Sequence, residues 1–199
     1  MIGARGQTLH SWRAGITSQP ANWFCQSPSP RLIDRKMTIT IKIDPFKPAD
    51  IIDVTAFVEA IQEHERATVA GLKPGSAIAE AYAHMLVRTA AARGGCVFLA
   101  KAGALAVGFV CAWPEEDADP LLEEDVRAHA YISDSYVKED WRKKGIGARL
   151  LAAAESAMQK QGCERVRICV KASNDLAISS YRRAGYRPYE IIFAKAFEN

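Results

Sequence analysis

The sequence predicts an α/β fold with a mixed central sheet, and two observations support that prediction. Segments that alternate apolar and polar residues, as strands do, are interspersed along the chain with segments whose apolar residues recur at helical spacing. In the second half, a strand pattern, a helix pattern and another strand pattern follow one another, which is the order of a βαβ unit with parallel strands. An earlier hairpin pattern adds antiparallel strands. We therefore expect a mixed sheet with a parallel βαβ core and flanking helices.

The composition indicates one globular domain. The 199 residues are 49% hydrophobic and 25% charged, which is enough for a sizeable core. No apolar run approaches the roughly 20 residues of a membrane span, so we expect no membrane partner. Five basic residues and one acidic residue lie within positions 1–36, which leaves a net charge of −1 for the rest of a chain whose total is +3. A net charge close to zero over residues 37–199 argues against a nucleic-acid partner.

Residues 1–36 differ in character from the rest. They show no sustained hydrophobic period and contain the break Pro28-Ser29-Pro30. We expect a disordered extension ahead of a domain at 37–199. The extension lacks the apolar core of a secretory signal, although its arginines and scarcity of acids resemble an organelle transit peptide. The plainer explanation is that Met37 is the working start.

From Thr38 onward the pattern becomes regular, and the expected elements end at glycines, prolines or turns. Asp50 is placed to cap the first helix, and Gly162 to end the helix that follows the central strand. The tight turn at 101–104 predicts a hairpin. In chain order we expect a strand at 38–43, helices at 51–66 and 76–92, strands at 96–100, 105–113 and 130–137, a helix at 146–161, a strand at 165–171, a helix at 176–184 and a strand at 189–197.

The cysteines and histidines predict neither disulfides nor a metal site. Five cysteines are an odd number, they form no Cys-x-x-Cys pair, and three of them fall inside apolar strand patterns. We interpret them as buried thiols of a reducing compartment and expect a cytoplasmic protein. The four histidines show no metal-ligand spacing, so we expect no metal.

A glycine turn, Arg142–Ala148, follows the central strand and opens a helix. Gly145 and Gly147 allow backbone conformations that a Cβ would forbid, so successive N–H groups can converge on one point. The helix begins at about Ile146 and adds its unpaired N–H groups and the positive end of its dipole, which predicts an anion site suited to a pyrophosphate. The spacing excludes a nucleotide-triphosphate loop, and Leu150 stands where a dinucleotide fingerprint needs a third glycine. A turn that only joins strand to helix is the alternative.

A second motif argues against a turn that only joins strand to helix. Together the two separated motifs resemble the GNAT superfamily of acyl-coenzyme A-dependent N-acetyltransferases. The first is Arg-x-x-Gly-x-Gly, beginning at Arg142 after a strand that ends at Val137. The second begins 29 residues after Gly145 and consists of Asn174, Ala177, Tyr181, Gly185 and Tyr186. The element order is also that of this family's fold. The resemblance covers roughly residues 39–197.

The resemblance implies acetyl-coenzyme A as the acyl donor. In the family, the central strand is splayed from the next parallel strand, and the pantetheine arm lies between them. Backbone amides of the glycine turn would hold the pyrophosphate, with added charge from the neighbouring Arg and Lys side chains. The implied cofactor-binding residues are Tyr136, Val137, Arg142, Lys143, Lys144, Gly145, Ile146, Gly147, Ala148 and Asn174.

The reaction implied by the resemblance is direct attack of a neutral amine on the thioester, with the Val137 N–H as an oxyanion donor. Tyr181 matches the family's general acid, which protonates the departing thiolate; a packed aromatic is its other possible role. An ammonium must lose a proton before it can attack, so a base or a water chain is needed. Asp134 is our candidate base, although strand alternation could turn its side chain away from the cleft.

We expect the acceptor to be a primary amine on a cationic small molecule. Seven carboxylates at positions 115–125 predict either a solvated loop or, because this loop lies near the acceptor site in the resembling family, an acidic rim that gathers the amine. A protein lysine or N-terminal acetyltransferase is one alternative. Cys169 stands where relatives that acetylate a ribosomal protein's N-terminus carry glutamate, which weakens the N-terminal form of that alternative. A sensor that binds acyl-coenzyme A without turnover is the other alternative, and a homodimer is possible.

Overall fold

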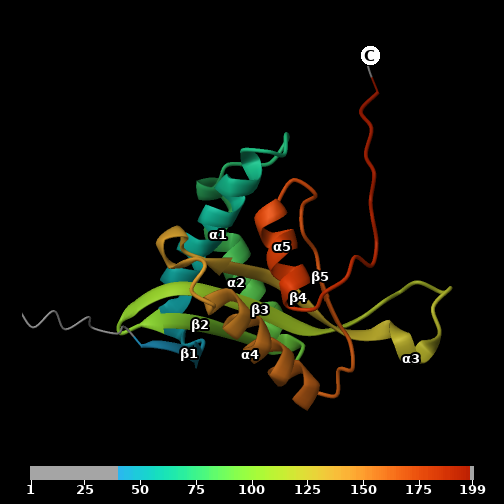
Figure 1. Ribbon diagram of the computed structural model, residues 1–199, viewed down its shortest axis with the longest axis horizontal. Coiled ribbons are helices and arrows are strands. Elements are labelled where there is room, and N and C mark those ends of the chain that lie inside the picture. The colour runs from blue at the N-terminus through green and yellow to red at the C-terminus, as the bar shows by residue number, and fades with distance from the viewer. Residues whose placement is uncertain (1–39, 198–199) are drawn as a thin grey trace, which may run out of the picture. The chain divides into compact units, whose positions relative to one another are not determined.

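A five-stranded sheet carries the candidate site, and helices cover both of its faces (Figure 1). The computed structural model describes residues 40–197, which belong to one compact unit. The expected extension, residues 1–36, lies outside the described residues. Within the sheet the strands stand side by side in their chain order, from β1 to β5.

The pairing confirms the predicted mixed sheet, because β1 to β4 pair antiparallel and β5 pairs parallel with β4. The α4 crossover therefore lies inside a parallel βαβ unit. None of the described helices is long and apolar enough to cross a membrane. The elements are β1 Ile41–Pro45, η1 Pro48–Asp50, α1 Ile51–Arg66, α2 Gly75–Ala92, β2 Cys96–Ala102, β3 Leu105–Glu116, α3 Glu124–Arg127, β4 Ala128–Val137, η2 Glu139–Trp141, α4 Ile146–Lys160, β5 Val166–Ile168 and α5 Asp175–Arg183.

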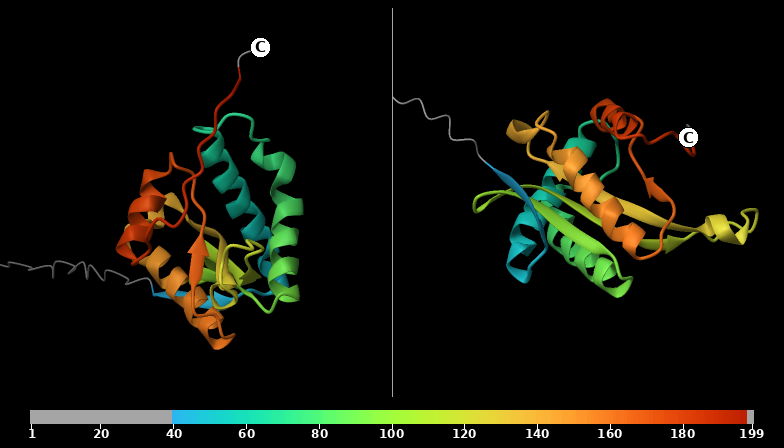
Figure 2. Two further views of the ribbon diagram at one scale, coloured as in Figure 1. Left: turned by 90° about the vertical axis from the view of Figure 1, so that its right-hand side faces the viewer. Right: turned by 60° about the horizontal axis from the view of Figure 1, so that its bottom comes forward.

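Two apolar cores lie on the two faces of the sheet. Helices α1 and α2 pack on one face and α4 packs on the other (Figure 2). Strand alternation sends Phe109 and Cys111 of β3 toward α1 and α2, and sends Val110 and Ala112 toward α4. A strand covered on both faces needs apolar residues on both, which explains the continuous apolar run that predicted β3.

An ion pair fixes the start of α1 to β2. The Lys101 Nζ lies 2.6 Å from the Asp50 Oδ1, and the Lys47 N–H donates to the other carboxylate oxygen at 2.9 Å. Burial raises the pKa of Asp50, but these partners outweigh burial and hold that pKa below its ordinary value. Asp50 does stand at the N-cap position, yet its side chain makes no bond to the first turn of α1, so the expected side-chain cap is wrong.

The strand expected at 189–197 does not form. The C-terminal segment, which we define as residues 187–197, contains neither helix nor strand and leaves the body of the domain toward the end marked C in Figure 1. Strand β5 is also shorter than the seven residues predicted for it, since it spans only Val166–Ile168. Both differences have one physical reason. A strand exists only where a neighbour pairs with it, and among the described residues nothing pairs with the outer edge of β5.

Candidate active site

The pairing of β4 with β5 stops early and leaves a gap in the sheet. Parallel pairing covers only Ala130–Ile132 of β4, opposite Val166–Ile168. The rest of β4, from Ser133 to Val137, lines a cavity of about 470 Å³ that also reaches α1, α4 and α5. The splayed parallel core that the resemblance implies is therefore present, and the cavity lies where the two strands part.

The backbone of Val137 faces this gap. Val137 lies opposite Gly108 of β3, and the following residue, Lys138, donates its N–H to the Val107 carbonyl at 2.9 Å. In an antiparallel ladder this makes Val137 and Gly108 a non-hydrogen-bonded pair, so the N–H and C=O of Val137 point away from β3. The Arg142 Nε donates to that carbonyl at 3.0 Å. The Val137 N–H is left pointing toward the cavity side.

The glycine turn lines the cavity, and its two glycines differ in conformation and surroundings. Gly145 is the N-cap of α4 with a φ of 75°, and Lys143 before it has a φ of 60°. Gly147 lies in the first turn of α4 without a positive φ, so the expectation that it needs a conformation forbidden to a Cβ is wrong. A Cβ on Gly147 would meet only the Val137 Cγ2, at 3.9 Å. What Gly147 provides is open space in front of the unpaired N–H groups of the helix start.

Nearly all of the residues that the sequence assigns to the cofactor reach this cavity. Lys144 is the exception, because its ammonium lies 2.8 Å from the Asp140 carbonyl and 4.9 Å from the centre of the Trp141 ring. The Asn174 side chain caps α5 by accepting the Ala177 N–H at 3.1 Å. The nine that line the cavity are Tyr136, Val137, Arg142, Lys143, Gly145, Ile146, Gly147, Ala148 and Asn174.

Asp134, the candidate base, also lines the cavity. A β-bulge interrupts β4 beside it, since Ile132 and Asp134 pair with consecutive residues of β3 and Ser133 has no counterpart. The carboxylate accepts hydrogen bonds from the Ser133 hydroxyl at 2.7 Å and from the Tyr82 hydroxyl at 3.3 Å. Burial raises the pKa of Asp134, and the two hydrogen bonds oppose that rise only in part. A raised pKa makes the carboxylate a stronger proton acceptor.

Tyr181, the candidate acid, lies on α5 and lines the same cavity. Its ring also packs 5.9 Å from the Tyr186 ring, so the packing role and the chemical role are compatible. Burial raises the pKa of Tyr181 to about 12, and the Asp134 and Glu65 carboxylates add to that rise. The phenol is therefore protonated at neutral pH, as a proton donor must be.

Glu65 is a cavity residue that the sequence analysis did not single out. It lies at the end of α1, four residues after Ile61, which lines the cavity too. Residues four apart lie on the same face of a helix. The sequence signal that could have identified Glu65 was therefore an acidic residue at the end of the apolar face of this helix. The charge of Glu65 raises the pKa values of both Asp134 and Tyr181. The cavity thus holds two carboxylates.

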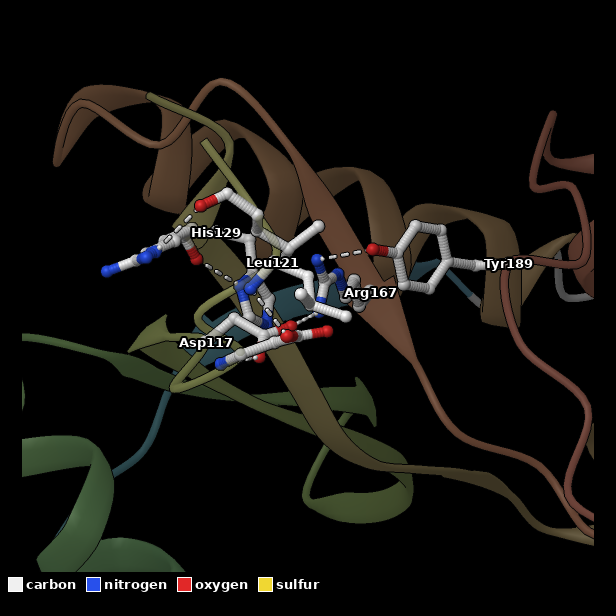
Figure 3. Close-up of polar contacts among 8 residues, drawn as sticks. Asp117, Leu121, His129, Arg167 and Tyr189 are labelled. Atoms are coloured by element: carbon white, nitrogen blue, oxygen red, sulfur yellow. Dashed lines mark hydrogen bonds and ion pairs between the residues drawn. The ribbon is translucent and has the colours of Figure 1, made fainter. Parts of the chain in front are cut away.

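The acidic loop lies at the other end of β4. Glu116 pairs with Ala128, where β4 begins, whereas the cavity starts at Ser133. None of the seven carboxylates at 115–125, all of them described, lines the cavity, so the acidic rim is wrong. Asp117 instead forms an ion pair with Arg167 of β5 (Figure 3), which anchors the loop to the sheet.

The four described cysteines are free thiols. Burial raises the pKa of Cys96 to about 11 and that of Cys111 further still, so both thiols stay protonated at neutral pH. Cys169 is exposed and lines the cavity. Within residues 40–197, no three His, Cys, Asp or Glu side chains lie close enough together to hold a metal ion.

Residues 58–186 match the acetyltransferase (GNAT) family. Mycothiol acetyltransferase of Corynebacterium aurimucosum is 35% identical over 63 residues, which are 32% of this chain and 21% of that protein. The matched region spans less than half the length of each curated relative.

Two solved structures share the fold. A GCN5-related N-acetyltransferase from Ralstonia eutropha JMP134 aligns with a TM-score of 0.62 at 18% identity, over 79% of this chain and 99% of that chain. The aminoglycoside N-acetyltransferase AAC(6')-Iy in complex with CoA aligns with a TM-score of 0.59 at 16% identity, over 79% and 95%. At such identities the likeness concerns the fold alone.

Proposed function

Because the chain belongs to the GNAT acetyltransferase family, we propose that it transfers an acetyl group from acetyl-coenzyme A to a primary amine on a cationic small molecule. The proposal rests on the observation that three groups line the same cavity. These are the half-buried carboxylate of Asp134, the phenol of Tyr181 and the helix start at Gly145 to Ala148.

The residues at the start of α4 fit the pyrophosphate of the donor. The first-turn amides of α4 have no partner within the helix, and they lie where Gly147 leaves space. Arg142 and Lys143 also line the cavity and supply positive charge. Acetyl-coenzyme A would supply the activated thioester, and its pantetheine arm would lie in the gap between β4 and β5.

Residues of this chain take part in the main steps of the transfer. Asp134 accepts a proton from the ammonium of the acceptor, which frees the nitrogen lone pair to form the new N–C bond. The Val137 N–H donates to the carbonyl oxygen as negative charge develops there. The C–S bond breaks, and Tyr181 gives its proton to the departing sulfur. The nitrogen loses its remaining extra proton to solvent, so the products are an amide and a free thiol.

The charge of the cavity favours a cationic acceptor. Glu65 and Asp134 place two carboxylates in it, and together they attract a substrate with more than one ammonium group. One structural neighbour is named an aminoglycoside N-acetyltransferase, and aminoglycosides are polyamines of this kind. The four described cysteines are free, which is in keeping with a cytoplasmic enzyme. A homodimer is the assembly that we propose for it.

A thiol-release assay over a library of amines tests the proposal. We expect acetyl-coenzyme A to release free thiol with diamines, polyamines or aminoglycosides and not with neutral amines of similar size. Calorimetric binding of acetyl-coenzyme A with no thiol release for any amine would favour a sensor instead. Absence of both binding and release would contradict the enzyme and the sensor alike.

A further inference from the structure

Helix α5 carries Tyr181 but is held to the domain by few contacts. None of its residues is fully buried, whereas α4 buries five of its own. In the part of the chain that the structure describes, two side-chain hydrogen bonds join residues 173–186 to other elements. One of them lies ahead of α5, where the Ser173 and Thr68 hydroxyl oxygens are 2.9 Å apart. The position of Tyr181 therefore depends on what holds the other end of the helix.

The second hydrogen bond joins the end of α5 to α4. Just past the helix the chain turns at Gly185, and the Tyr186 N–H donates to the Tyr181 carbonyl at 3.0 Å. The Tyr186 hydroxyl donates to a carboxylate oxygen of Glu155 at 2.5 Å. The centres of the Tyr186 and Tyr181 rings are 5.9 Å apart. Tyr186 thus contacts both the backbone and the ring of Tyr181, and Glu155 fixes Tyr186 to α4. We call the pair of Glu155 and Tyr186 the α5 anchor.

The α5 anchor lies outside the cavity. Leu151, four residues before Glu155 on the same face of α4, lines the cavity, whereas neither Glu155 nor Tyr186 does. Helix α4 is a firm support, because its apolar side is buried against the sheet. The two anchor residues do not reach the reacting groups, so any effect that they have on the reaction passes through Tyr181.

The hydrogen bond of the α5 anchor is of the strong kind. A hydroxyl that donates to a carboxylate makes a charge-assisted bond, which is stronger than a bond between neutral groups. Glu155 and Tyr186 are both half-buried, so water competes for the bond only in part. Burial and the Glu155 carboxylate raise the pKa of Tyr186 well above its ordinary value, so the phenol keeps its proton and remains the donor.

We infer that Glu155 and Tyr186 are positioning residues that hold the Tyr181 hydroxyl where the departing sulfur needs its proton. The inference rests on the proposed function, in which Tyr181 is the proton donor. Proton transfer requires the donor and the acceptor to be within hydrogen-bond reach, and a misplacement of about 1 Å can cost about 10²-fold in rate. A helix with no fully buried residue has little packing of its own to prevent such a shift.

Kinetics on the full-length protein test the inference, with an amine that the unchanged protein acetylates. Tyr186→Phe and Glu155→Ala each remove the hydrogen bond, and we expect each to lower kcat by about 10- to 10²-fold. The affinity for acetyl-coenzyme A, measured by calorimetry, should stay nearly unchanged, because the expected pyrophosphate site belongs to the start of α4.

Two further variants of α4 serve as controls. Glu155→Gln keeps a side-chain oxygen that can accept the hydrogen bond, so it should retain most of the activity that Glu155→Ala loses. Gln159→Ala changes an exposed residue one turn further along the same helix and should leave kcat unchanged.

A double variant separates positioning of the acid from general loosening of the domain. Tyr181→Phe has no proton to give, so the addition of Tyr186→Phe should lower kcat no further. If the hydrogen bond only stabilised the domain, the two losses would multiply instead. Multiplied losses would overturn the inference, and so would full turnover by Tyr186→Phe alone. A loss of acetyl-coenzyme A affinity as large as the loss in kcat would overturn it too, because the effect would then not be confined to the acid.

Hydrogen exchange tests the α5 anchor without any turnover. The helical amides of residues 178–184 should exchange about tenfold faster in Tyr186→Phe than in the unchanged protein, while those of α4 should not change. Equal exchange rates in α5 would overturn the inference whatever the activity. Faster exchange in α5 of a protein that releases no thiol with any amine would overturn the proposed function and the acid step with it, and would leave Glu155 and Tyr186 only as an anchor of the helix.

Discussion

The Ser133 hydroxyl donates a hydrogen bond of 2.7 Å to the Asp134 carboxylate, and this bond joins the β-bulge of β4 to the acidic centre of the cavity. The Tyr82 hydroxyl from α2 adds a second hydrogen bond to the same carboxylate. Asp134 is thereby held in one orientation while burial keeps its pKa raised. An oriented carboxylate with a raised pKa is suited to take a proton from an amine.

Asp134→Asn should lower acetyl transfer by about 10²- to 10⁴-fold, the usual contribution of a general base. It should also raise the free energy of unfolding at neutral pH. The pKa of Asp134 is raised above 3.8 in the folded state, so ionisation of this group destabilises the fold as the pH rises through the folded pKa. Steady-state kinetics and urea unfolding at pH 7 measure the two effects. Ser133→Ala is the control, because it keeps the base and should lose far less activity.

Tyr181→Phe should lower kcat by about 10²- to 10⁴-fold and leave the affinity for acetyl-coenzyme A nearly unchanged. The phenylalanine ring still packs beside Tyr186, and only the proton donor is lost. With a pKa of about 12, the phenol of the unchanged protein stays protonated throughout the neutral range, so no loss of activity from its ionisation should appear below about pH 11. Calorimetry and kcat measurements separate binding from chemistry. Near-full turnover of the variant would show that Tyr181 is not the proton donor and has only a packing role.

The two glycines of the turn should respond differently to substitution. Gly147→Val should weaken binding of acetyl-coenzyme A strongly with little loss of stability, because the new side chain enters the space in front of the helix start. Gly145→Ala should instead lower stability by about 1–2 kcal/mol, because Gly145 has a φ of 75°. Calorimetry and thermal unfolding on both variants check the contrast. Unchanged affinity of the Gly147 variant would reject the pyrophosphate site.

Glu65→Gln should raise the KM for a diamine or polyamine about tenfold, which corresponds to about 1.4 kcal/mol. A monoamine should be affected less, because it has no second ammonium for the carboxylate to attract. Glu59→Gln is the matched control on the same helix, since Glu59 is exposed and does not line the cavity. Equal effects of the two variants on KM would show that Glu65 does not contribute to the binding of the acceptor.

Lys101→Met should lower the free energy of unfolding by about 1–3 kcal/mol at pH 7, because it leaves the buried carboxylate of Asp50 without its charged partner. The pKa of Asp50 is lowered in the folded state, so its contribution to stability is present above 3.8 and is lost as the pH falls through the lowered folded pKa. Denaturant unfolding at pH 7 and at pH 3 checks this. The gap between variant and unchanged protein should narrow at the lower pH.

The sequence by itself determined the elements whose causes are local. The helix at 51–66 is predicted by the apolar spacing along its own face, and the helix start at Ile146 by the glycine turn in front of it. The resemblance carried by the two motifs also indicated most of the residues that line the cavity. Hydrophobic periodicity and turn chemistry act within a few residues, so one sequence is enough to identify them.

Only the tertiary structure decided where Asp134, Glu65 and the C-terminal segment lie. The direction of Asp134 depends on a bulge that forms against β3, and Glu65 reaches the cavity because α1 packs on the sheet. Residues 189–197 have the pattern of a strand, yet a strand takes its hydrogen bonds from a neighbour. A local pattern shows that a segment is able to form a strand, and the pairing itself depends on which strand edge is within reach.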